Sequence, residues 1–122
     1  MALATAAVAL LMAQAPAQAI DSVDVAVEEL EANRNEAAIS RIEANTALDA
    51  NDPARLINLG IAHAREGDAA KARAMFEAAS DGDRLQLETA DGNWVDSRNL
   101  ARRALAMLER GEFRTQSRTA MR

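Results

Sequence analysis

Residues 53–81 hold two runs of helical spacing separated by a single Gly-Asp step, and they constrain the fold more than any other segment. Asp52 and Pro53 form a typical helix start, because aspartate caps free backbone N–H groups and proline suits the first helical position. Gly67 is a left-handed stop signal, and Asp68 can cap the next helix. The sequence therefore predicts two antiparallel helices joined by a tight turn.

The segment 53–86 resembles a tetratricopeptide repeat. It matches the family in a leucine–glycine pair, a turn glycine and a small-large-small set: Leu59, Gly60, Gly67, Ala72, Phe76 and Ala79. The small residues let the two helix backbones approach closely, and the phenylalanine fills the space beside them. Leu56 and His63 depart from the family's usual tryptophan and tyrosine. The resemblance gives His63 a packing role between the helices.

The same spacing, moved back by one repeat, covers residues 19–52 more weakly. Asn33 takes the place of Gly67 and keeps the turn chemistry, because asparagine also tolerates the left-handed conformation. Asn45 fits poorly at the position of Ala79. We expect a degenerate first repeat whose second helix carries Ala38, Ile39, Ile42 and Leu48.

The repeat pattern ends after residue 83 and gives way to alternating apolar and polar residues around Asp91-Gly92. An Asp-Gly pair between alternating flanks predicts a β-hairpin, here over residues 84–95. A two-residue turn would place three large apolar side chains on one face: Leu85, Leu87 and Trp94. A helix follows over 96–110, and residues 112–122 lack periodicity and are expected to form a flexible tail.

The fold class expected is mainly α, with two tetratricopeptide-like helical hairpins, a short β-hairpin and a C-terminal capping helix. Two helical hairpins cannot bury a continuous core by themselves. The β-hairpin and last helix would supply the cap, with Trp94 as its largest wedge. The alternative is burial of the same apolar face in a homodimer. The folded domain would comprise residues 20–111.

Residues 1–19 contain no charged side chain and form an apolar run that is too short to span a bilayer. The run ends in Ala17-Gln18-Ala19, a pattern that signal peptidases accept. We expect a cleaved signal peptide and a periplasmic or secreted protein of an exported bacterial type. The alternatives are an uncleaved membrane anchor and an alanine-rich helix packed on the domain.

The sequence offers little catalytic chemistry. It contains no cysteine and a single histidine, which excludes thiolate nucleophiles and argues against cysteine- or histidine-ligated metals. No motif supplies a nucleophile and an oxyanion site for His63. The acidic residues before position 32 lack the spacing of a calcium loop and are expected to form a solvated face. We therefore expect no enzyme, no cofactor and no metal.

The tetratricopeptide resemblance implies a concave surface that binds a protein or peptide, lined by the first helix of each repeat. Val27 and Ile61 occupy positions where a carboxylate-clamp subgroup needs polar residues, which disfavours binding of a charged chain terminus. An apolar partner groove is expected instead, carried over to Val23, Val27, Leu30, Glu31, Ile57, Ile61, Ala64 and Arg65.

Charge is distributed unevenly along the chain. Residues 21–83 hold 14 acidic and 6 basic side chains, whereas 84–122 hold 5 acidic and 8 basic ones. The arginines on the last helix are expected to form a solvated basic face, with electrostatic docking on an acidic partner, a membrane surface or a second copy as the alternative: Arg98, Arg102, Arg103 and Arg110. Net acidity and the shortage of stacking aromatics argue against nucleic acid.

These observations predict a non-catalytic protein-interaction or scaffold module of the cell envelope. The alternative is a homodimerising structural accessory subunit, and an enzyme is the third and weakest hypothesis.

Overall fold

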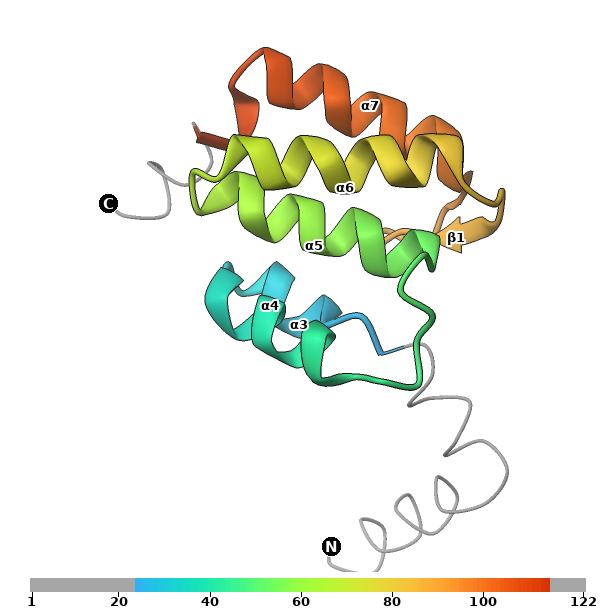
Figure 1. Cartoon of the computed structure of the whole chain (residues 1–122), viewed down its shortest axis with the longest axis horizontal. Coiled ribbons are helices and arrows are strands. Elements are labelled where there is room, and N and C mark those ends of the chain that lie inside the picture. Colours follow the sequence, from blue (N-terminus) through green and yellow to red (C-terminus); the bar gives the residue numbers. More distant parts are fainter. Residues whose placement is uncertain (1–23, 115–122) are drawn as a thin grey trace, which may run out of the picture.

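A computed structural model describes residues 24–114, so the predicted signal segment 1–19, Val23 and residues 115–122 lie outside the described part. The mainly helical fold class is confirmed, with one small antiparallel sheet. Figure 1 shows helices stacked in layers, in which α6 packs against both α5 and α7 and α4 packs against α5. The elements are α3 (Val27–Glu31), α4 (Asn35–Ala44), α5 (Pro53–Arg65), α6 (Ala69–Asp81), β1 (Gln86–Glu88), β2 (Trp94–Asp96) and α7 (Ser97–Glu109).

The antiparallel pair α5–α6 forms as the sequence predicts. Both helices begin at an aspartate, Asp52 or Asp68, whose side chain accepts a hydrogen bond from the backbone N–H three residues later, at 2.9 and 3.1 Å. Gly67 adopts φ 88°, and the following N–H of Asp68 donates to the carbonyl of His63 at 2.9 Å. The left-handed glycine therefore reverses the chain within one turn.

The interior of this helical pair is built from small residues around one large ring. Phe76 is fully buried, and Gly60 lies directly beside it. The other repeat-signature residues on the two helices are also buried: Leu59, His63, Ala72 and Ala79. Ile61 is partly buried and packs against all three hydrophobic clusters of the core. It therefore links the N-terminal helices to α6 and α7.

The N-terminal helical pair is shorter than the sequence suggests. Asn33 has φ 60° and joins α3 to α4, with the turn chemistry expected of it. Ala26 also has φ 60°, and its N–H is capped by the Asp24 carboxylate at 3.1 Å, so α3 has only five residues. Asn45 stops α4 in extended backbone and donates from Nδ2 to the carbonyl of Asp24 at 3.1 Å. The expectation that α4 continues to Leu48 is wrong.

The acidic face expected near α3 is only partly solvated. Arg41 of α4 pairs with Glu29 at 2.7 Å and with Asp24 at 2.8 Å. The Glu29 side chain is only 14% exposed, and the hydrogen bond from the Arg41 guanidinium lowers the pKa of its carboxyl group. This network fastens α3 to α4, where few apolar contacts are available.

The β-hairpin adopts a different register from the predicted one. Leu87 lies opposite Val95, and Glu88 lies opposite Trp94. The loop contains three residues and is closed by a hydrogen bond that the N–H of Thr89 donates to the carbonyl of Asn93 at 2.8 Å. Within it, Gly92 is left-handed, with φ 85°. Because the side-chain period of a strand is two, this shift of one residue moves Trp94 to the opposite face from Leu87.

Trp94 is therefore not the wedge of the cap: its side chain is 65% exposed. The capping contacts come from Leu87 of β1 and from the buried Ala101 and Ala104 of α7. Phe113 adds a further contact, since it is 4% exposed and its ring stacks on Phe76 at a centroid distance of 5.9 Å. The expectation that the flexible tail begins at residue 112 is corrected, because Phe113 belongs to the core.

Candidate functional site

The apolar groove expected over the first helices is filled by the protein itself. Leu30, Ile57 and Ala64 are all at most 9% exposed. Ile57 lies in the cluster that includes Leu87 and Ala101, and Ala64 lies with the rings of the aromatic stack. The docking of α7 and the β-hairpin onto α5 has covered the face that the family resemblance would leave open. The expectation of a continuous, open apolar groove is therefore wrong.

Arg65, another expected groove residue, has a structural role. Its guanidinium donates from Nη1 to the carbonyl of Leu30 at 2.8 Å and so connects α5 to the end of α3. Burial lowers the pKa of Arg65, because desolvation disfavours its charged form. The neighbouring Glu66 accepts a hydrogen bond from Asn35 at 3.3 Å, which ties the end of α5 to the start of α4.

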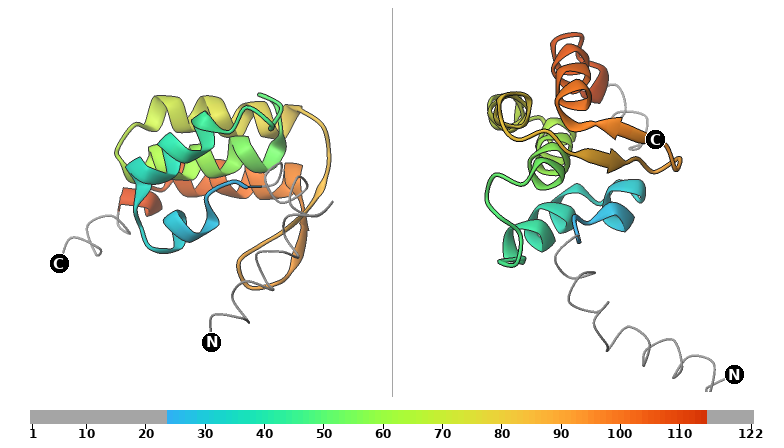
Figure 2. Two further views of the ribbon diagram at one scale, coloured as in Figure 1. Left: turned by 90° about the horizontal axis from the view of Figure 1, so that it is seen from below. Right: turned by 90° about the vertical axis from the view of Figure 1, so that its right-hand side faces the viewer.

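Of the large apolar side chains in the described part, the exposed ones are Val27, Leu85 and Trp94, at 45%, 45% and 65%. Val27 lies on α3, and the other two belong to the β-hairpin region. Both views in Figure 2 place α3 and the hairpin on the same side of α5. An exposed tryptophan on a defined secondary-structure element is typical of a contact site, since tryptophan is enriched among residues that dominate binding energy. The sequence does not predict this surface, because a two-residue turn at Asp91-Gly92 would place Trp94 on the same face as Leu87.

The base of the hairpin is fixed to the junction of α6 and α7. Ser97 is fully buried, and its Oγ accepts from the N–H of Leu85 at 2.9 Å and donates to the carbonyl of Asp83 at 3.3 Å. Arg98 donates from Nε to the carbonyl of Gly82 at 2.8 Å. These bonds hold the hairpin at a defined position relative to the helices.

The tip of the hairpin is ordered by its own polar side chains. The Asp91 carboxylate accepts hydrogen bonds from the Thr89 hydroxyl, from the Asn93 N–H at 3.2 Å and from the Asn93 amide at 3.0 Å. The hydrogen bond from Thr89 is the main cause that lowers the pKa of Asp91. Trp94 is thus displayed next to a turn in which each of these side chains has a defined partner.

The arginines expected to form one docking face have different surroundings. Arg98 donates a hydrogen bond to the backbone at the base of the hairpin. Arg110 pairs with Glu112, and this hydrogen bond raises the pKa of the Arg110 guanidinium. Arg102 donates to Asn99 Oδ1 at 3.2 Å and is exposed, as is Arg103. Arg110 is exposed too but is paired with Glu112, so of the four arginines Arg102 and Arg103 are exposed without an ion pair to a carboxylate among those in the described range.

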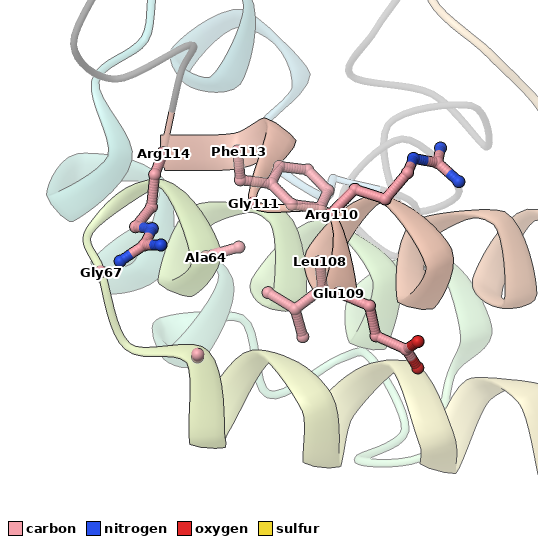
Figure 3. Close-up of a pocket in the computed structure, with 9 residues that line it drawn as sticks. Ala64, Gly67, Leu108, Glu109, Arg110, Gly111, Phe113 and Arg114 are labelled. Atoms are coloured by element: carbon pink, nitrogen blue, oxygen red, sulfur yellow. The ribbon is translucent and has the colours of Figure 1, made fainter.

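A cavity of about 320 Å³ lies where the end of α5 and the start of α6 meet the end of α7. Figure 3 shows Phe113 and Leu108 beside Ala64, with the side chains of Glu109 and Arg110 extending in different directions. Its lining is mixed, from Ala64, Gly67, Ala69, Leu108, Glu109, Arg110, Gly111, Phe113 and Arg114. Two of its charged lining residues pair with residues outside the lining, Glu109 with Arg73 and Arg110 with Glu112.

Within residues 24–114, no three histidine or acidic side chains come together as metal ligands would. His63 is 8% exposed and belongs to the interior of the helical pair. None of the helices in this range has the length and apolar character needed to cross a bilayer. Comparison with models of protein families, with curated proteins and with solved structures gave no match to this chain.

Proposed function

We propose that this protein is a non-catalytic interaction module that binds a protein partner through the side formed by the β-hairpin and α3. The observation that carries the proposal is Trp94: its side chain is 65% exposed although the hairpin is anchored at both its base and its tip. An aromatic side chain held in water at a fixed position costs little entropy when a partner covers it. Val27 of α3 is a second exposed apolar residue, and α3 lies on the same side of α5 as the hairpin.

The order of the helical pairs supports a tetratricopeptide-like arrangement. α3 and α4 are joined by a left-handed Asn33, and α5 and α6 by a left-handed Gly67, at the interval of one repeat. Binding between first helices of successive repeats is the mode that the resemblance implies. In this chain α7 and Phe113 occupy part of that face, so the proposed contact moves outward to the hairpin. The site of action would be the cell envelope, as the leader sequence suggests.

The test is site-specific photo-crosslinking in cells. A photoreactive amino acid is placed at Gln86, which is exposed and lies on the same face as Trp94 in the observed register. The control position is Glu77, an exposed residue of α6. We expect adducts of defined mass at Gln86 that disappear when Trp94→Ala is added.

Adducts that form equally at Glu77, or that persist in the Trp94→Ala background, would contradict the proposed surface. The adduct mass also separates the alternatives. A mass of two copies of this chain would favour the homodimerising subunit, and a larger or smaller mass identifies a different partner.

A further inference from the structure

Resting on the proposed function, we propose that the partner contributes an extended, basic segment that adds as a strand to the outer edge of β1. In this arrangement one of its arginine or lysine side chains lies next to Glu88 and extends across it toward the ring of Trp94. The proposal combines three observations: an unpaired strand edge, an exposed tryptophan and a carboxylate directly across from it.

The free edge follows from the hydrogen-bond alternation of the hairpin. The pairs Thr89–Asn93 and Leu85–Ser97 are hydrogen-bonded across the two strands. Because bonded and non-bonded pairs alternate in an antiparallel ladder, the N–H and C=O groups of Gln86 and Glu88 point away from β2. Within the described range the sheet consists of β1 and β2 alone.

The edge of β1 is better suited than that of β2 to take an added strand. Gln86 and Glu88 present two successive outward-pointing backbone sites, the spacing that a partner strand uses. β2 runs directly into α7, which begins at Ser97 and is capped by the Asp96 side chain, so its edge ends at the helix. An added strand on β1 would also protect an edge that otherwise invites non-specific pairing.

The charge on the exposed face selects a cation. Glu88 and Trp94 form a non-hydrogen-bonded pair, in which Cβ atoms approach most closely, so the two side chains are neighbours on the same face of the hairpin. The other carboxylates of the hairpin are engaged: Asp96 pairs with Arg84 at 2.9 Å, and Asp91 accepts hydrogen bonds within the turn. A guanidinium or ammonium group over the ring would gain both a cation–π contact and an ion pair with Glu88.

The experiment uses the full chain and two blocked synthetic peptides, Thr-Val-Arg-Val-Arg-Val-Thr and the same peptide with both arginines replaced by glutamate. Trp94 is the only tryptophan in the sequence, so its emission and its quenching by acrylamide report on this site alone. We expect the arginine peptide to shift the emission to shorter wavelength and to reduce quenching, saturably. The glutamate peptide should do neither.

Two variants separate strand addition from simple charge attraction. Glu88→Gln should weaken the affinity for the arginine peptide by about tenfold, because one charged hydrogen bond is lost. Gln86→Pro removes an outward N–H without touching a bond inside the hairpin, and should also weaken binding by about tenfold, whereas Gln86→Thr should not. The near-UV circular dichroism of Trp94 in the free variants shows whether the hairpin remains intact, and Glu77→Gln is the matched surface control.

Equal binding of both peptides, or undiminished binding to Gln86→Pro with an intact hairpin, would overturn strand addition. These outcomes are distinct from failure of the proposed function. If crosslinking at Gln86 still captures a partner that Trp94→Ala loses, the interaction module stands while the basic strand is rejected.

Discussion

A Cβ atom built on Gly60 of α5 would lie 2.4 Å from Cε1 and 2.7 Å from Cδ1 of Phe76 on α6. Carbon atoms in packed interiors stay about 3.5–4.0 Å apart. The ring has little freedom to withdraw, since Phe76 is fully buried and stacked on Phe113. The distance between the backbones of α5 and α6 therefore depends on the absence of a side chain at Gly60.

The first prediction concerns Gly60→Ala. In a helix interior this substitution ordinarily stabilises by about 0.5–1 kcal/mol, because alanine loses less backbone entropy on folding. Here the added methyl group collides with the Phe76 ring, and overpacking of this kind costs about 1–3 kcal/mol. We expect a lower free energy of unfolding, measured by denaturant titration.

The control for Gly60→Ala is the same substitution made together with Phe76→Leu. Leucine is smaller at the point of collision, so Gly60→Ala should cost less in the Phe76→Leu background than in the natural one. An increase in stability for the single variant Gly60→Ala would show that α5 and α6 can separate without cost.

The second prediction concerns Phe113, which closes the core beyond the end of α7. Phe113→Ala removes a buried ring that stacks on Phe76, and such truncations cost about 3–5 kcal/mol. Arg114→Ala changes an exposed neighbour and should alter stability by less than about 0.5 kcal/mol. Thermal or denaturant unfolding of the two variants measures the difference. Equal, small effects would place Phe113 outside the cooperative core.

The helix ends and the α5–α6 pair could be predicted from sequence because their causes are local. Asp52 and Asp68 each cap a helix by accepting a hydrogen bond from the N–H three residues later. Gly67 has a left-handed backbone, which few residue types other than glycine adopt. Phe76 and its small neighbours could be recognised by spacing alone. These features need no knowledge of how distant segments dock.

The hairpin register and the fate of the groove could not be predicted, because they depend on non-local contacts. Asp91-Gly92 fits both a two-residue and a three-residue loop, and the choice reverses the face of Trp94. Burial of Ile57 depends on Leu87 and α7, which come from later segments of the chain. The residues of α5 are equally compatible with burial by a later segment of the chain and with burial by a partner.

The third prediction compares substitutions at Asn33, which has φ 60° between α3 and α4. Asn33→Ala keeps a Cβ in left-handed backbone but removes the side-chain oxygen that accepts from Asn35 at 3.3 Å. It should lower stability by about 1–2 kcal/mol. Asn33→Gly relieves the backbone and should cost less than Asn33→Ala, as denaturant unfolding would show. If alanine is tolerated as well as glycine, the strained turn does not contribute to stability.

The last prediction concerns acid sensitivity at Glu29. The hydrogen bond from Arg41 lowers its pKa in the folded protein below the ordinary value of 4.5, so the unfolded chain binds the proton more readily. This stabilisation is fully present above pH 4.5 and is lost as the pH falls through the folded pKa. Glu29→Gln should therefore be less stable than the natural chain at neutral pH, and the difference should shrink in acid. Denaturant unfolding between about pH 3 and 7 measures it. Glu43→Gln, an exposed change on α4, is the control, and a Glu29→Gln deficit that stays constant with pH would contradict the role of this ion pair.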